Sequence, residues 1–312
     1  MEISFIIVSW NACRYLDQCL ESVERESYGL EVETIVIDNA STDGSPEMVQ
    51  KKYPKVNLIK QTENLGFAKA NNLGLSISKG KYLFLINSDI IIKMDCIKKL
   101  HAYMENNPDV GIAGPRILYP DGTFQRSCMK FVNLWNSLCI AIGLSSIFPK
   151  SRTFGGFEMG WMKWNETCSV DIVNGCFWAI RRTAFEQVGG LDERFFMYGE
   201  DMDWCKRYSD AGWKRVFFND AESIHFGGAS SSNKPIRFYI EMIKANLQYW
   251  KKHHGKLQAF ICSILYTIHC AIRILGYSTL SLLDKDSREI SSFKVKKNLA
   301  VLSFLFTKTN AF

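Results

Sequence analysis

The chain has 312 residues, 47% of them hydrophobic, and a formal net charge of +6. This length allows one large domain with an appendage, and the sequence contains no internal repeat and no low-complexity linker. Its ten cysteines form no C-x-x-C pair and follow no regular spacing. They argue against a disulfide framework or a zinc site, and they predict reduced core residues in a cytosolic protein.

The first three elements predict a β-α-β unit. Residues 3–8 form a continuous apolar, β-rich run, which is typical of a strand buried on both faces. A helix is expected over residues 14–25 and a second strand over residues 33–37, so the order predicts a parallel sheet with a right-handed crossover. The run at 3–8 is too short for the apolar core of a signal peptide, and we expect no cleavable leader.

Small polar residues follow both of these strands. Ser9 and Asn11 come after the first strand, and Asp38 and Asn39 come after the second. The carboxyl ends of parallel strands are where open α/β sheets bind ligands, and Asp38 is well placed to accept hydrogen bonds from a base or ribose. Asp43 has two readings, a ligand contact or an ordinary turn and helix start.

The next segment, residues 64–74, combines glycines with asparagines at an expected helix start. Glycine there lets backbone approach a ligand closely, and a helix N-terminus favours phosphate. The segment matches neither the Gly-x-Gly-x-x-Gly fingerprint nor a Walker loop. A plain capped helix remains the alternative.

Asp89 is the one carboxylate in an apolar stretch that includes residues 82–85 and 90–92. A lone carboxylate in such a run is costly to bury unless something pairs with it. A strand ending at Ile86 would place Asp89 at the ligand-binding edge of the sheet. A hard cation between Asp89 and a diphosphate would account for the charge. The alternative is a strand-end turn built from Asn, Ser and Asp.

Three carboxylates, Glu200, Asp201 and Asp203, fall within four residues. A helix is expected over residues 202–211, and helix capping explains one or two of these acids. It does not explain the aromatic run at 195–198, which excludes water and raises the pKa of a nearby carboxylate. Such surroundings can produce a general base near neutral pH.

The C-terminal part differs from the rest in charge. Residues 231–312 hold thirteen Lys and Arg against four Asp and Glu, a net charge of +9, whereas the remainder has a net charge of −3. We therefore predict a catalytic domain over residues 1–230 and a basic helical extension over residues 231–312, with the boundary near 229–233.

Two helices are expected in this extension, a basic, aromatic one over residues 237–254 and an apolar one over residues 257–283. This pair suits peripheral contact with a cytoplasmic membrane surface. The alternative is packing on the catalytic domain or on a second copy in a homodimer. His269 and Arg273 make a transmembrane span costly, and no recognisable nucleic-acid-binding module is present.

Five motifs in this order closely resemble those of family 2 glycosyltransferases, and most of all the bacterial rhamnosyltransferase-type branch. They are residues 8–11, 36–44, 64–68, 87–89 and 198–203. The resemblance covers residues 1 to about 230. It implies an α/β GT-A fold with a mostly parallel central sheet, a nucleotide-sugar donor, Mg²⁺ or Mn²⁺, and inversion at the sugar carbon. Many members carry Asp-x-Asp where this chain has Asn87-Ser88-Asp89, so weaker metal dependence is implied.

The resemblance also implies roles for single residues. The residues implied to line the nucleoside pocket are Ser9, Asn11, Asp38 and Asn39. Those implied to approach the nucleotide, its phosphates or the sugar are Asn64, Gly66, Phe67, Ala68, Asn71, Asn87 and Ser88. Asp89 would bind the metal. His225 would bind the same metal or the phosphates, and a satisfied strand-end histidine is the alternative. Asp201 would be the general base, and Glu200 would orient Asp201 or the acceptor. Residues 171–180 would shape the sugar and acceptor pocket, and Arg116 would contact phosphate or be a surface arginine.

These observations predict an inverting transferase. The donor would be a deoxythymidine- or uridine-diphosphate sugar, with L-rhamnose one candidate, and the acceptor a polyprenyl-linked or growing surface glycan at the inner face of the cell membrane. One base and no second nucleophile suffice for a single inverting displacement. One rival is a sugar-nucleotide nucleotidyltransferase, but that class usually opens with a glycine-rich loop, and residues 9–14 contain no glycine. The other is a non-catalytic glycan-binding subunit, against which Asp89 and Asp201 argue.

Overall fold

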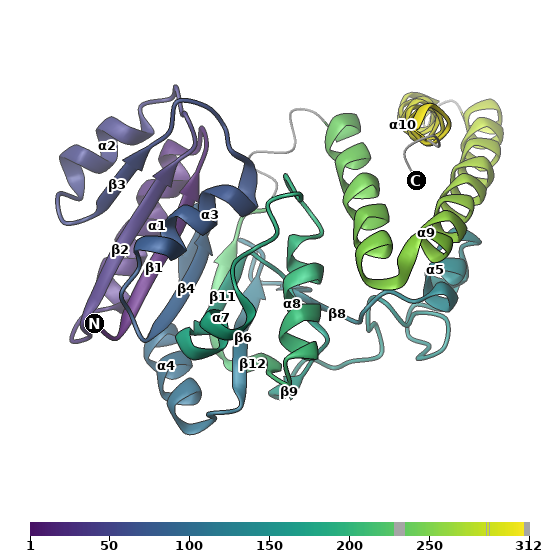
Figure 1. Cartoon of the computed structure of the whole chain (residues 1–312). Coiled ribbons are helices and arrows are strands. Elements are labelled where there is room, and N and C mark those ends of the chain that lie inside the picture. Colours follow the sequence, from purple (N-terminus) through teal and green to yellow (C-terminus); the bar gives the residue numbers. More distant parts are fainter. Residues whose placement is uncertain (228–234, 285, 287, 309–312) are drawn as a thin grey trace. The chain divides into compact units, whose positions relative to one another are not determined.

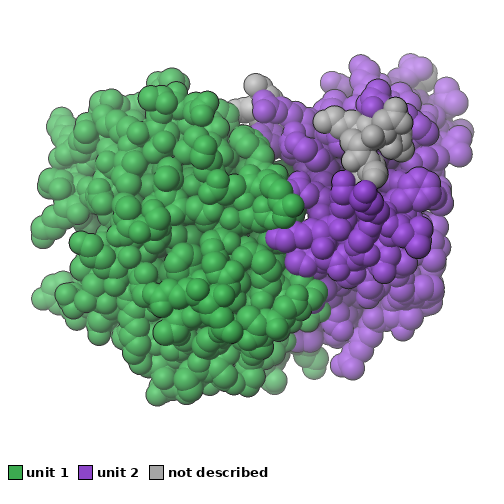
Figure 2. All heavy atoms as spheres, in the orientation of Figure 1, with its two compact units in different colours: residues 1–129, 163–232 green, residues 130–162, 233–312 purple. Residues whose placement is uncertain are grey.

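A computed structural model describes the chain except for residues 228–234, 285, 287 and 309–312. The chain divides into two compact units (Figure 2). The first unit contains residues 1–129 and 163–232, and the second contains residues 130–162 and 233–312. The predicted boundary at 229–233 lies outside the described residues. The sequence did not set residues 130–162 apart from the catalytic domain.

The first unit is built on a mixed sheet with the strand order β3-β2-β1-β4-β11-β6-β12-β5. The strands on this path are β1 Ile3–Ser9, β2 Val32–Asp38, β3 Asn57–Lys60, β4 Tyr82–Asn87, β5 Ile90–Ile92, β6 Val110–Leu118, β11 Phe177–Arg181 and β12 Lys214–His225. Short strands add to it: β7 Phe124–Gln125 pairs with β6, and β9 Cys168–Ser169 pairs with β12. A separate pair joins β8 Cys128–Met129 to β10 Ile172–Val173.

The strands β3, β2, β1 and β4 run parallel, as the β-α-β pattern predicted. In contrast, β11 runs antiparallel to both β4 and β6. The helices of this unit are α1 Cys13–Glu26, α2 Ser45–Lys52, α3 Gly66–Ile77, α4 Cys96–Asn106, α7 Arg182–Val188 and α8 Glu200–Asp210. Figure 1 shows these helices flanking the sheet.

Local sequence accounts for these elements. The side chains of Ile3 and Phe5 are fully buried, as expected for a strand covered on both faces. In α1, Leu16, Leu20 and Val23 recur at helical spacing and face the core. A Cβ at Gly74 would lie 2.5 Å from Ile6, so a glycine is needed where α3 packs on β1.

The helix predicted over residues 202–211 begins two residues earlier than expected, at Glu200. The reason is Gly199, whose φ of 79° turns the chain directly into the helix. Glu200 and Asp201 therefore lie in the first turn of α8 instead of before it. The predicted apolar face is confirmed, because Trp204, Cys205 and Tyr208 are buried.

The second unit is helical in its described residues. Its helices are α5 Leu134–Ala141, α6 Leu144–Ile147, α9 Pro235–Leu283 and α10 Arg288–Lys308. The two helices predicted over 237–254 and 257–283 are the arms of α9, which breaks at Gly255 with φ 85° and ψ 171°. Figure 1 shows α10 between these arms. Lys297 lies over the Tyr239 ring of the first arm at 4.2 Å, and Lys294 lies over the Tyr277 ring of the second at 4.8 Å.

Candidate active site

Two predicted nucleoside-binding residues lie side by side at the carboxyl ends of β1 and β2. Ser9 and Asp38 are register partners in these parallel strands, and both are buried. Asp38 Oδ2 accepts a hydrogen bond from Ser41 N at 3.0 Å. Ser9 Oγ and Asp38 Oδ1 have no hydrogen-bond partner among the described residues. Leaving such atoms unpaired is costly, so both are expected to meet a ligand.

Asn11 and Asp43 join the two loops that follow these strands. Asn11 Oδ1 accepts from Thr42 N at 2.8 Å, and Asn11 N donates to Ser41 Oγ at 2.9 Å. Asp43 accepts from Cys13 N at 2.8 Å and from Ser45 N at 3.1 Å. These contacts match the turn and helix-start reading of Asp43.

The start of α3 is bound by side chains within the protein. Asn39 Nδ2 donates to Gly66 O at 3.1 Å, and Asn39 Oδ1 accepts from Leu65 N at 3.3 Å. Asn64 Oδ1 accepts from Gly66 N at 2.9 Å, and Asn71 Nδ2 donates to Phe67 O at 2.9 Å. The predicted site residues of this segment, including the buried Ala68, are therefore brought together.

The space beside Gly66 is filled by Phe196, from the loop that leads into α8. Phe67 N donates to Phe196 O at 2.9 Å, and a Cβ at Gly66 would lie 2.6 Å from that same oxygen. The amides of residues 65–67 thus all have protein partners. In this structure Gly66 permits close approach of Phe196, and direct phosphate binding by these amides stays a prediction.

The two predicted metal ligands are in contact. Asp89 follows β4, and its Oδ1 lies 3.3 Å from His225 Nε2 at the end of β12. Asp89 Oδ2 accepts from Gly227 N at 3.2 Å, and His225 Nδ1 lies 3.0 Å from Gln125 Oε1. A proton on Nδ1 would leave the Nε2 lone pair free for a cation.

This pair fits a divalent cation only in part. No group of three or more His, Cys, Asp or Glu side chains that could hold a metal occurs among the described residues. A carboxylate oxygen suits Mg²⁺ or Mn²⁺, and these ions usually complete their coordination with phosphate oxygens and water. Asp89 and His225 therefore fit a cation that arrives together with a diphosphate.

Glu200 and Asp201 form an acidic pair in the first turn of α8, in which Glu200 is buried and Asp201 is half-buried. Glu200 is 7% exposed, and its Oε2 has no hydrogen-bond partner within the described part of the chain. Burial, and next the charge of Asp201, raise the pKa of Glu200 to about 8. Burial also raises the pKa of Asp201, whose Oδ1 accepts from Met202 N at 2.8 Å. The pair therefore holds a proton more readily than ordinary carboxylates do.

Asp89 and Asp201 lie around one buried thiol. The pKa of Cys176 is raised to about 12, first by burial, then by the charge of Asp89 and, more weakly, by that of Asp201. Asn87 N donates to Cys176 O at 2.9 Å. Ser88, the next residue before Asp89, is 9% exposed. The predicted metal ligand and the predicted base thus come from distant parts of the sequence, and the charges of both act on the same thiol.

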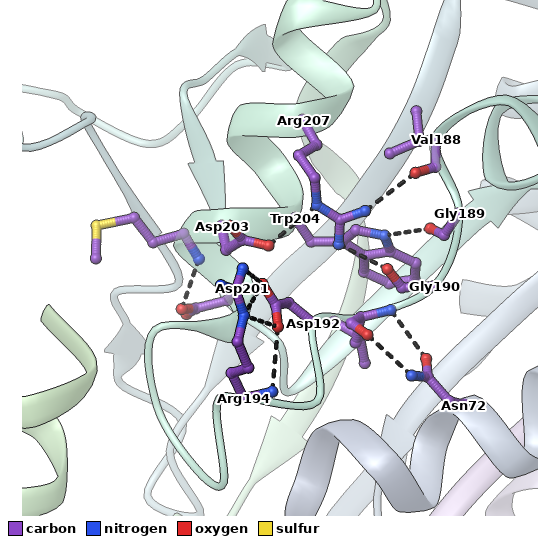
Figure 3. A network of polar contacts seen from close by, with 12 residues as sticks. Asn72, Val188, Gly189, Gly190, Asp192, Arg194, Asp201, Asp203, Trp204 and Arg207 are labelled. Carbon is purple, nitrogen blue, oxygen red and sulfur yellow. Dashed lines mark hydrogen bonds and ion pairs between the residues drawn. The ribbon is translucent and has the colours of Figure 1, made fainter. Parts of the chain in front are cut away.

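A polar network fixes the loop that precedes α8 (Figure 3). From α8, Arg207 donates to Val188 O at 3.0 Å and to Gly190 O at 2.6 Å, and Trp204 Nε1 donates to Gly189 O at 2.8 Å. From α3, Asn72 exchanges two hydrogen bonds of 2.9 Å with the Leu191 backbone.

The sequence interpretation missed Asn72, Arg207 and Phe196 as supports of the site. The spacing of Asp203 and Arg207, four residues apart, is typical of a helical ion pair and could have identified one of them. No local signal identifies the other two, because their partners are far away in the sequence.

Two other expectations concern the strands around the site. Residues 171–180 form β10, a turn and β11, and Trp178 Nε1 closes the turn by donating to Val173 O at 2.8 Å. Arg116 donates to Trp164 O and, at 3.3 Å, to Asn219 Oδ1. Its guanidinium also lies 4.8 Å from the Phe124 ring centroid. Arg116 is half-buried and supports the sheet, so the phosphate-contact reading gains no support.

Comparison with known proteins identifies a family and several relatives. The sequence model of the family described as Glycosyl transferase family 2 matches residues 4–189. The chain is 31% identical over 215 residues to an N-acetylglucosaminyl-diphospho-decaprenol L-rhamnosyltransferase of Mycobacterium tuberculosis, covering 65% of this chain and 69% of that protein. It is also 21% identical to an uncharacterized glycosyltransferase of Haemophilus influenzae, over 99% of this chain and 97% of that one.

Solved structures share the fold. The mannosyltransferase PcManGT of Pyrobaculum calidifontis, solved with GDP-Man and Mn²⁺, matches with a TM-score of 0.56 at 15% identity, over 99% of this chain and 88% of that chain. TarS of S. aureus matches with a TM-score of 0.52 at 18% identity, over 85% of this chain but only 42% of TarS. Together with the mixed sheet and its flanking helices, these matches confirm the predicted GT-A fold.

Proposed function

Because the chain belongs to glycosyltransferase family 2, we propose that it transfers a sugar, with inversion, from a nucleoside diphosphate to a hydroxyl of a lipid-linked or growing surface glycan. The observation that carries this proposal is the 3.3 Å contact between Asp89 and His225, which fits a cation, together with Asp201 in the first turn of α8, where burial raises its pKa. A cation-bound diphosphate and a proton-accepting carboxylate are the two groups that such a displacement requires.

L-Rhamnose is the sugar we propose first, with a deoxythymidine- or uridine-diphosphate donor. The support is the mycobacterial relative, whose name states an L-rhamnosyl transfer to a diphospho-decaprenol-linked sugar. The same relative supports a polyprenyl-linked acceptor, and we propose that the reaction takes place at the cytoplasmic face of the membrane. The unpaired Ser9 Oγ and Asp38 Oδ1 are the atoms we assign to the nucleoside.

Charge decides the roles in the reaction. When bound by Asp89 and His225, Mg²⁺ or Mn²⁺ would stabilise the negative charge that develops on the leaving diphosphate. Asp201 takes the proton from the attacking hydroxyl on the opposite side of the sugar. Burial raises the pKa of both Glu200 and Asp201, so the pair shares a proton more readily than ordinary carboxylates do, and we assign the role of proton acceptor to Asp201. One acceptor without a second nucleophile favours single displacement and inversion.

Purified protein can be tested with a panel of nucleotide sugars, each with and without Mn²⁺. A ligand at 100 times its dissociation constant stabilises the fold by about 2.7 kcal/mol, which a thermal shift detects. We expect a dTDP- or UDP-sugar to give the largest shift, and Asp89→Ala to remove its Mn²⁺-dependent part. Transfer to a soluble acceptor, with the anomeric configuration read by NMR, then tests inversion.

Three results would contradict the proposal. No shift with any nucleotide sugar would exclude the donor class. A product that retains the donor's configuration would exclude single displacement. Formation of a nucleotide sugar from a sugar phosphate and a nucleoside triphosphate would identify a nucleotidyltransferase instead.

A further inference from the structure

The second arm of α9 carries an exposed apolar stripe along one side. Its members are Leu257, Phe260, Ile264, Ile268, Ile272 and Leu275, which are 38% to 72% exposed. Their spacing of three and four residues keeps them on one side of the helix. The stripe extends for about 27 Å, at 1.5 Å per residue.

The polar groups of this arm point into the second unit. Arg273 is the one charged residue between 257 and 283, a stretch that the structure describes completely. It is half-buried, and its Nε donates to Nε2 of the buried His269 at 2.6 Å. Burial, and next the charge of Arg273, lower the pKa of His269 to about 4, so the imidazole is neutral and accepts this bond. The arm thus turns its one charged residue inward and leaves a continuous apolar stripe exposed, unlike an ordinary surface helix in water.

The unit that carries the stripe is strongly basic. Residues 130–162 and 233–312 hold sixteen Lys and Arg against five Asp and Glu, a net charge of +11, which leaves −5 for the first unit. Lys251, Lys252 and Lys256 come directly before the stripe, and Lys296 is exposed on α10. An apolar face beside clustered lysines is complementary to an anionic lipid surface.

We propose that the stripe is a membrane-docking surface, and that the second arm of α9 lies flat in the headgroup region of an anionic bilayer with the stripe toward the acyl chains. The proposal deepens the proposed function and rests on it for the lipid-linked acceptor. A sugar acceptor anchored in that bilayer would then be met by an enzyme held at the same surface.

Two alternative explanations of the exposed stripe, a transmembrane helix and contact with a second copy of the chain, fit less well. Among the described residues one helix, Pro235–Leu283, is long and apolar enough to cross a membrane. Lys294 of α10 lies over the Tyr277 ring of the second arm, however, so a spanning arm would bring Lys294 into hydrocarbon. A second copy of the chain would bring two units of net charge +11 together, which repel each other.

The test is co-sedimentation of the full chain with vesicles of phosphatidylcholine that contain about 30% phosphatidylglycerol, and with phosphatidylcholine alone. We expect binding to the anionic vesicles and its release by alkaline carbonate. The double variant Phe260→Glu with Ile264→Glu should bind about tenfold more weakly or worse, because the burial of two large apolar side chains is lost. Met94→Glu is the matched control: Met94 is 79% exposed in the first unit, and its variant should bind as the native chain does.

Each contrary result overturns the proposal. Absence of binding to anionic vesicles, or equal binding by the double variant, removes the stripe as a lipid contact. Resistance to carbonate indicates a spanning helix. A dimer that the double variant converts to monomer, with unchanged vesicle binding, indicates a second copy. Transfer to a water-soluble acceptor separates this inference from the proposed function: the double variant should keep that activity, and failure of every form to transfer would contradict the function alone.

Discussion

Burial decides what each polar group at the site can do. Ser9 Oγ, Asp38 Oδ1 and Glu200 Oε2 are all buried and have no partner among the described residues. Each unpaired atom costs about 1–3 kcal/mol, which a stable protein tolerates mostly where a ligand supplies the missing hydrogen bond. All three atoms belong to residues that the sequence motifs singled out. The motifs and the burial of unpaired atoms therefore identify the same residues.

The acidic pair separates the role of base from that of support. Asp201→Asn keeps size and capping capacity but cannot take a proton, so transfer should fall by roughly 10²–10⁴. Donor affinity should change little, because a general base would contact the acceptor and not the diphosphate. Glu200→Gln should be milder, since we assign Glu200 only the role of orienting Asp201 or the acceptor. The measurement is the transfer rate together with the donor dissociation constant for both variants.

Two outcomes would contradict this assignment. If Glu200→Gln loses transfer while Asp201→Asn keeps it, the base is Glu200. If both variants stay active, the pair is only a helix cap.

Stability should depend on pH through Glu200. Its pKa is raised from 4.5 to about 8, so the native state binds this proton more tightly than the unfolded chain does. The free energy of unfolding should therefore decrease by up to a few kcal/mol as the pH rises from about 5 to about 8. In the Glu200→Gln variant this side chain cannot ionise, so the decrease in the free energy of unfolding that comes from Glu200 should be absent. Urea unfolding of both proteins at several pH values tests it, and parallel curves for the two proteins would refute it.

At the scale of elements, the site is held in place by contacts among α3, α8 and the loop before α8. The β-α-β start, the strand ending near Asp89 and the helix carrying the acids follow from local patterns of burial, turns and caps. The contacts of Phe196 with Gly66 and of Asn72 with Leu191 do not, because the last pair is 119 residues apart. The break of α9 at Gly255 and the placing of residues 130–162 with the C-terminal helices also depend on packing that periodicity does not encode.

The contact between Gly66 and Phe196 can be tested with a second glycine as control. Gly66 and Gly29 have φ of +79° and +85°, so alanine at either position is strained by about 1–2 kcal/mol. Gly29 has nothing within 4 Å of an added Cβ, whereas at Gly66 that atom would meet Phe196 O at 2.6 Å. Gly66→Ala should therefore destabilise the fold more than Gly29→Ala and should alone slow transfer, by displacing the loop that leads to Asp201. Equal losses of stability and unchanged transfer would show that the contact is unimportant.

The anchor of α8 offers an equally matched comparison. Arg207 pairs with Asp203 at 3.0 Å, and Asp203 is fully buried. Arg207→Leu would take the guanidinium away from that buried charge and should lower the free energy of unfolding by about 3–5 kcal/mol. Lys206 pairs with Asp210 at the same spacing, but Asp210 is 56% exposed, so Lys206→Leu should cost at most about 1 kcal/mol. Denaturant unfolding of both variants measures the difference, and similar costs would mean that Arg207 is no more than a surface residue.

At the scale of the whole molecule, charge is divided between the units, with −5 on the first and +11 on the second. If the second unit docks on lipid, vesicle binding should contain a part that salt screens and a part that it does not. The Debye length falls from about 10 Å at 0.1 M salt to about 3 Å at 1 M, so added salt should weaken the attraction of the lysines and leave apolar burial in place.

Removing two exposed lysines of the second unit, Lys256→Gln with Lys296→Gln, should weaken binding at low salt by about tenfold to thirtyfold, since each lysine near an anionic surface contributes about 1 kcal/mol. The difference from the native chain should vanish near 1 M salt. Lys98→Gln with Lys99→Gln removes the same charge from exposed positions of the first unit and should leave binding unchanged. Co-sedimentation across a salt series measures all three proteins. If the two double variants weaken binding equally, net charge and not the basic unit attracts the bilayer; if salt has no effect on the native chain, the attraction is not electrostatic.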